Sequence, residues 1–135
     1  MKKQLFESLA PFRYEQLPDG TIRINGTVNP RHIALRFEVT VPDNVSEIGD
    51  EAFSHCKFIT ELTLPEKLKK IGNRAFSGCS GLISVSIPEG VEQVGSDIFS
   101  DCYDLTTVYC SSLHLEKWAT DWVGNTDAKI KTSNK

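Results

Sequence analysis

Apolar and polar positions repeat along the chain every 23 residues, without a gap, through residues 37–110. Neighbouring copies at this spacing share a core, because one copy of that length cannot bury its own apolar face. The apolar columns are Ile48, Ile71 and Val94; Ile59, Leu82 and Leu105; Leu62, Val85 and Val108; and Leu64, Ile87 and Cys110. The columns of identical residues are Pro42, Pro65 and Pro88; Gly49, Gly72 and Gly95; Phe53, Phe76 and Phe99; Ser54, Ser77 and Ser100; and Cys56, Cys79 and Cys102.

Each copy predicts a strand, a crossing segment and a short helical turn. Residues 84–87 alternate polar and apolar side chains, which indicates a strand, and Pro88 ends it. Residues 91–94 then carry the chain to the opposite side. We expect the following glycine to turn at positive φ and the residue after it to cap a helical turn. These cap positions are Asp50, Asn73 and Ser96, and the turn delivers Ala52, Ala75 and the phenylalanine column to the core.

The predicted fold is therefore a mostly-β repeat solenoid with short helical turns, a right-handed stack of leucine-rich repeats. At 135 residues the chain fits one folded domain. We divide it into an N-terminal segment with a hairpin cap (1–35), the repeats (36–110) and a C-terminal cap of a helix and a strand (111–135).

The two ends depart from the repeat. Asp19-Gly20 lies between alternating runs, which predicts a β-hairpin within residues 12–26. After Cys110, apolar residues follow helical spacing and predict a helix that ends near Gly124. A last strand over 128–131 would place Ile130 one position out of register with Val108. The apolar helix face comprises Leu115, Trp118, Ala119, Trp122 and Val123; its two tryptophans either cover the end of the core or offer an aromatic patch to a ligand.

The segment Ile48–Cys56 and its copy Ile71–Cys79 resemble the BspA-type leucine-rich repeat. The resemblance is strong over about residues 35–110. The third copy departs from it with Asp97-Ile98 before the phenylalanine, and the first with Arg36 at its strand entry. The resemblance implies an N-terminal hairpin cap and a closing tryptophan-bearing helix. This family is common in bacterial surface proteins and occurs in some microbial eukaryotes, and its surface members are associated with adhesion to host proteins.

Charge and hydropathy exclude several classes of function. Residues 37–110 carry twelve acidic and five basic groups, and this acidic middle repels phosphate backbones, so we expect no nucleic-acid partner. No apolar run approaches the ~20 residues of a spanning helix, so we expect no membrane insertion. Glu7 and Pro11 interrupt any signal sequence, which favours a cytoplasmic protein as written. A cell-surface or secreted protein whose signal precedes residue 1 is the alternative.

The cysteine column invites three interpretations. Zinc sites normally use closely spaced cysteine pairs, and a spacing of 23 supplies none. Stacked copies would place neighbouring cysteines within reach of a disulfide. The column faces inward, however, where cysteine acts as a small apolar residue, so buried thiols are favoured over a disulfide or a metal. No cofactor is expected.

Catalytic chemistry lacks a candidate site. Cys110 and His114 form the one nearby cysteine–histidine pair, but Cys110 occupies an apolar column and a nucleophilic thiolate needs exposure. The glycines are single and spaced by the repeat, which provides no phosphate-binding loop. We expect the protein not to be an enzyme. Lys70 stacks beside Glu47 and Lys69 beside Glu92, which indicates a solvated charge ladder rather than a basic patch.

Outward-facing residues of the predicted strands form the candidate partner-binding surface. We call them the strand rows: Glu38, Glu61, Ser84 and Thr107 in one row, and Thr40, Thr63, Ser86 and Tyr109 in the other. Stacking fixes their geometry in advance, which lowers the ordering cost of binding. The prediction is a non-catalytic protein-interaction module. The alternative is a structural or capping fragment of a larger cell-surface, adhesin-like repeat protein.

Overall fold

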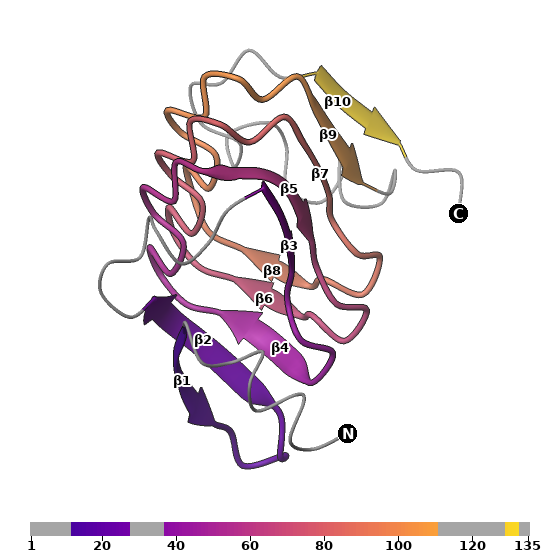
Figure 1. Cartoon of the computed structure of the whole chain (residues 1–135). Helices are drawn as coiled ribbons and strands as arrows, with labels where there is room; N and C mark the ends of the chain where they lie inside the picture. The colour runs from indigo at the N-terminus through magenta and orange to yellow at the C-terminus, as the bar shows by residue number, and fades with distance from the viewer. Residues whose placement is uncertain (1–11, 28–36, 111–128, 133–135) are drawn as a thin grey trace.

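The computed structural model describes residues 12–27, 37–110 and 129–132, in which the chain forms a β-solenoid (Figure 1). Its strands belong to two sheets that face each other across the core. Sheet A has the order β1-β2-β4-β6-β8, and sheet B has the order β10-β9-β7-β5-β3. The strands are β1 Phe12–Gln16, β2 Ile22–Thr27, β3 Phe37–Thr40, β4 Val45–Ile48, β5 Ile59–Thr63, β6 Lys70–Ile71, β7 Ser84–Ser86, β8 Gln93–Val94, β9 Thr107–Cys110 and β10 Lys129–Thr132.

Strand register reproduces the 23-residue period. In sheet A, Ile71 of β6 pairs in parallel with Ile48 of β4 on one side and with Val94 of β8 on the other. In sheet B, Val85 of β7 pairs with Val108 of β9. Residues of one sequence column therefore lie side by side in space, and the predicted mostly-β solenoid is confirmed.

Phenylalanine rings fill the centre of the stack. Phe53, Phe76 and Phe99 have no exposed surface. The Phe76 ring centroid lies 5.3 Å from that of Phe53 and 5.5 Å from that of Phe99. Pairs of this geometry stabilise a core beyond the area they bury, by roughly 0.5–1.5 kcal/mol each. Ile98, which replaces alanine in the third copy, is also completely buried.

The predicted helical turns are wrong, because no helix forms in the described residues. In the segment from Gly49 to Cys56, successive amides alternate between a carbonyl of the same turn and a carbonyl of the next copy. The amides of Ala52, Ser54 and Cys56 each donate to the carbonyl three residues earlier in the chain. The amides between them bond to the next copy, as Phe53 N does to Ala75 O at 2.7 Å. An α-helix would direct every amide along its own axis. In successive tight turns, by contrast, every second amide is available to form a hydrogen bond with the neighbouring copy.

The expected positive φ at the column glycines is also wrong. That conformation falls two residues later, at Glu51, Arg74 and Asp97, with φ near 55° (55°, 54° and 54°). Glycine is needed at these positions because a side chain there would collide with the preceding copy. A Cβ on Gly72 would lie 2.6 Å from Asp50 N and would collide with the Asp50 carboxylate. That carboxylate accepts a hydrogen bond from Asn73 N at 2.8 Å, so Asp50 links two copies rather than capping a helix.

The predicted N-terminal hairpin is confirmed. β1 and β2 pair antiparallel, and their turn has Gly20 at φ 88° with Gly20 N bonded to Leu17 O at 2.9 Å. β2 then pairs in parallel with β4, so the hairpin extends sheet A. Its role as a cap stays a prediction.

The expected register of the last strand is wrong. Ile130 of β10 pairs directly with Val108 of β9. The connection between these strands is thus one residue shorter than a repeat, which brings Ile130 into line. The helix predicted after Cys110, with Trp118 and Trp122, lies outside the described residues.

Replacing Gly72 by alanine tests the spatial role of the glycine column. Gly72→Ala should lower the free energy of unfolding by about 1–3 kcal/mol, because the added methyl group meets the Asp50 backbone and carboxylate. Gly90→Ala is the matched control, since its Cβ would make ordinary contact at 3.6 Å with Glu66 O. Urea unfolding of both variants gives the comparison. Equal losses in the two variants would contradict this role.

Candidate interaction surface

The strand rows form on the outer face of sheet B. Glu38 pairs in register with Glu61, Glu61 with Ser84, and Ser84 with Thr107. Thr40 pairs with Thr63, and Ser86 with Tyr109. The residues between them, such as Leu62 and Val85, are buried in the core. Six of the eight row residues are exposed, while Ser84 and Thr107 are partly buried. The structure thus brings together every residue predicted for this surface.

Chemical character changes along the rows. Glu38 and Glu61 are adjacent carboxylates at the β3–β5 end, and like charges placed opposite each other destabilise a sheet. Hydroxyl groups follow across β7. Tyr109, 39% exposed, supplies the one aromatic ring of the rows at β9. A partner would therefore meet carboxylates at one end and a half-exposed ring at the other.

Two features of the segments that form or lead into sheet B were missed from the sequence. Lys129 and Lys131 of β10 pair in register with Thr107 and Tyr109, so the backbone positions of the rows continue into β10. The signal was present in the sequence, but the register expected for Ile130 concealed it. Phe58 and Ile83, which precede β5 and β7, are large apolar residues with 44% and 47% exposure. Thr60 and Thr106 occupy the column of Ile83 in the copies on either side, and Gly81 and Asp104 follow Phe58 in its column. This mismatch is the signal that could have identified both residues.

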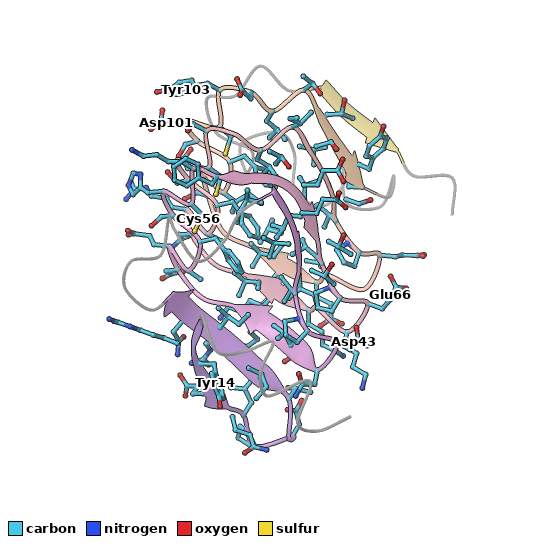
Figure 2. All side chains as sticks on the ribbon, in the orientation of Figure 1. Tyr14, Asp43, Cys56, Glu66, Asp101 and Tyr103 are labelled. Carbon is cyan, nitrogen blue, oxygen red and sulfur yellow. The ribbon has the colours of Figure 1, made fainter. Side chains whose placement is uncertain are left out.

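The cysteines lie inside the stack, and Figure 2 labels Cys56 among them. All four are buried thiols in the structure. Cys79 Sγ donates to Phe53 O, and Cys102 Sγ donates to Phe76 O, each at 3.1 Å. Burial raises the pKa of the Cys102 thiol to about 12 and raises those of Cys79 and Cys110 as well. Such thiols stay protonated at neutral pH, where a nucleophile must ionise.

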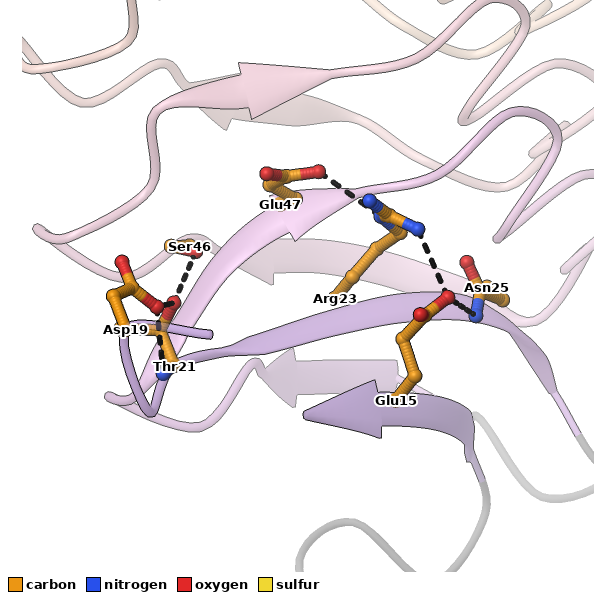
Figure 3. Close-up of polar contacts among 7 residues, drawn as sticks. All are labelled: Glu15, Asp19, Thr21, Arg23, Asn25, Ser46 and Glu47. Atoms are coloured by element: carbon orange, nitrogen blue, oxygen red, sulfur yellow. Dashed lines mark hydrogen bonds and ion pairs between the residues drawn. The ribbon is translucent and has the colours of Figure 1, made fainter. Parts of the chain in front are cut away.

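The charge ladder on sheet A differs in part from the prediction. Glu47 does lie in register with Lys70, but its described ion pair is with Arg23 of β2, at 3.0 Å (Figure 3). Arg23 also contacts Glu15 of β1 at 2.9 Å, so one guanidinium joins the hairpin to the first copy. The sequence concealed this contact because Arg23 precedes the repeats and lies 24 residues from Glu47, not 23.

Other candidate chemistry has little support within the described residues. No group of three or more His, Cys, Asp or Glu side chains among them could hold a metal ion. Cys110 is buried, and its proposed partner His114 lies outside the described ranges. None of the secondary structure described is a helix of the length and apolar character that crosses a membrane.

Comparison with known proteins agrees with this geometry. Residues 1–124 match the model of the BspA type leucine rich repeat region. The chain belongs to this family. A leucine-rich repeat protein from Bacteroides capillosus superposes with a TM-score of 0.72 at 21% identity, covering 92% of this chain and 95% of its own. One from Bacteroides ovatus gives 0.59 at 31% identity over 67% of this chain.

This BspA-type chain spans 23% of the length of the Bacteroides ovatus protein. Comparison with curated proteins finds no match. The family resemblance inferred from the motifs at Ile48–Cys56 and Ile71–Cys79 is thereby confirmed. Its members are repeat proteins, consistent with an interaction or surface module.

Thiol burial predicts a loss of stability at alkaline pH. In the unfolded chain Cys102 ionises near its ordinary pKa of 9.0, whereas in the folded chain it stays protonated to about 12. The unfolded state alone therefore releases this proton between those values, and the free energy of unfolding falls by about 1.4 kcal/mol per pH unit for this thiol. Urea unfolding at about pH 8 and pH 10 measures the loss.

Cys102→Ala should lose about 1.4 kcal/mol less than the parent between these two pH values. Ser100→Ala is the control, because it removes a neighbouring hydroxyl, bonded to Ser77 at 2.8 Å, that does not ionise in this range. It should keep the parent's full alkaline loss. Identical losses in the parent and in Cys102→Ala would contradict the shifted pKa.

Proposed function

We propose that the chain is a non-catalytic protein-interaction module that binds a protein partner across the strand rows. The observation that carries this proposal is the register of sheet B, which holds Glu38, Glu61, Thr63 and Tyr109 on one exposed face. The backbone of every row residue is already paired in the sheet, so little ordering is needed on binding. Membership of the repeat family supports an interaction role.

The partner's chemistry follows from the rows. Two adjacent carboxylates and several hydroxyl groups favour a polar or mildly basic protein surface over the phosphates of a nucleic acid. Tyr109 is the one large anchor within the rows, and tyrosine is among the residues that dominate interface energies. Its removal should cost more than the removal of any row serine or threonine.

A second candidate is a structural fragment of a larger cell-surface, adhesin-like repeat protein. It is favoured by the coverage of the Bacteroides ovatus protein, of which this chain matches 23%. In such a protein these copies would extend a longer solenoid, since each copy contacts only its neighbours. This second candidate corresponds to a location at the cell surface. The first candidate is compatible with the cytoplasmic location expected from the sequence.

The proposal is tested on a captured binder with three variants. Tyr109→Ala should weaken its affinity about tenfold to thirtyfold, the loss typical of an aromatic anchor of roughly 1.5–2 kcal/mol. Glu61→Lys should weaken it several-fold and reduce its dependence on salt. Lys69→Glu, an exposed change on the side of sheet A, is the control and should bind as the parent does. Calorimetry or surface plasmon resonance measures all three.

The opposite pattern would refute the assignment. If Lys69→Glu abolishes binding while Tyr109→Ala and Glu61→Lys bind normally, the partner uses another face. If the parent chain retains no binder at all, the structural role is favoured instead.

A further inference from the structure

A shallow polar groove crosses sheet A, on the side of the solenoid away from the strand rows. Two adjoining hollows make it up, of about 570 Å³ and 460 Å³. They share Asp50, Lys70 and Gly72, so they form one open channel that runs along the stacking direction from β2 to β8. Other lining residues include Asn25, Glu47, Asn73, Glu92 and Gln93.

The glycine column forms the floor of this groove. Gly49, Gly72 and Gly95 add no side chain to it, and the short side chains of Asp50 and Asn73 lie over the next glycine. Asn73 Oδ1 accepts a hydrogen bond from Ser96 N at 3.0 Å, as Asp50 does from Asn73 N. These bonds hold the polar atoms of the floor in fixed positions, which lowers the ordering cost for any ligand.

The net charge of the lining is small. Arg23 and Lys70 are positive, and Glu47, Asp50 and Glu92 are negative, which leaves one excess negative charge. Arg23 is paired with Glu47 at 3.0 Å. The amide groups of Asn25, Asn73 and Gln93 can each donate and accept hydrogen bonds. A lining with one excess charge offers little attraction to a polyanion or a polycation. It suits a neutral ligand whose groups also donate and accept, as sugar hydroxyls do.

The spacing of the lining distinguishes a glycan from a peptide. Equivalent backbone positions recur along the groove once per copy, about 4.8 Å apart, although their side chains differ, as Glu47, Lys70 and Gln93 do. This interval is close to the advance of one pyranose ring in an extended oligosaccharide. An extended peptide presents side chains to one face only every second residue, about 6.6–6.8 Å apart, and falls out of step. We propose that this groove binds a neutral, extended oligosaccharide, with one sugar ring for each copy it crosses.

The experiment is a titration of the full, isotope-labelled chain, followed by amide NMR. The probes are cellotetraose, chitotetraose and maltotetraose, each added to about 10 mM, a range suited to the millimolar affinities of few-contact ligands. Cellotetraose or chitotetraose, whose β-1,4 linkages keep the chain extended, should produce saturable shifts at the Gly72, Asn73 and Gly95 amides while the amides of β5 and β9 stay unchanged. The corresponding disaccharide should bind more weakly, because it spans fewer copies. Maltotetraose, whose α-1,4 linkages curve the chain, should bind more weakly.

Variants of exposed side chains locate the contacts. Lys70→Ala and Gln93→Ala should each weaken the best tetrasaccharide about fivefold, the effect of one lost hydrogen bond. Lys67→Ala is the matched control, an exposed lysine that does not line the groove, and should leave the affinity unchanged.

Three outcomes would overturn the proposal. The first is that none of the three tetrasaccharides shifts the groove amides. The second is that Lys67→Ala weakens binding as much as Lys70→Ala does. The third is that an eight-residue peptide of alternating serine and threonine saturates the groove amides as tightly as the best glycan, which would assign the groove to a peptide.

Discussion

Side-by-side hydrogen bonding between successive 23-residue copies is the interaction on which the rest of the structure depends. It operates on all three sides of each coil: Gly72 N bonds to Ile48 O on the side of sheet A, Ile87 N to Tyr109 O on the side of sheet B, and Phe76 N to Ile98 O in the turns. Because the copies have equal length, a residue of one copy lies beside the residue of the same column in the next copy. A side chain that suits the packing in one copy is therefore needed at the same position in the others.

This constraint explains the identical columns better than the properties of single residues do. Phenylalanine recurs because each ring packs on the ring of the neighbouring copy, and the cysteines recur where a small thiol reaches the carbonyl of the preceding copy. Glycine recurs because the aspartate or asparagine of the preceding copy occupies the space of its side chain. The same stacking holds the strand rows and the polar groove in fixed positions on opposite sheets. The core is thus conserved from copy to copy within the chain, and variation is left to the exposed positions.

Column agreement made much of the fold predictable, including the parallel register, the buried cysteines and the placement of the strand rows, because each depends only on equal spacing. The wrong predictions concern contacts between copies, which the sequence of a single copy does not reveal. A run such as Gly49–Cys56 has the composition of a capped helical turn, and only the neighbouring copy's carbonyls show where its alternate amides are directed. Ile130 appeared out of register because the final connection departs from the period. Arg23 and its ion pairs were hidden because β2 joins the sheet from outside the repeat.

Native-state hydrogen exchange tests most directly the claim that stacking between copies holds all three sides together. The informative amides are those of Gly72, Ile87 and Phe76, one from each side, all bonded to a neighbouring copy. If the stack is one cooperative unit, their exchange free energies should agree within about 1 kcal/mol and match the free energy of global unfolding. If the Phe76 amide instead exchanges several kcal/mol more easily than the other two, the turns open independently of the sheets and the account is contradicted.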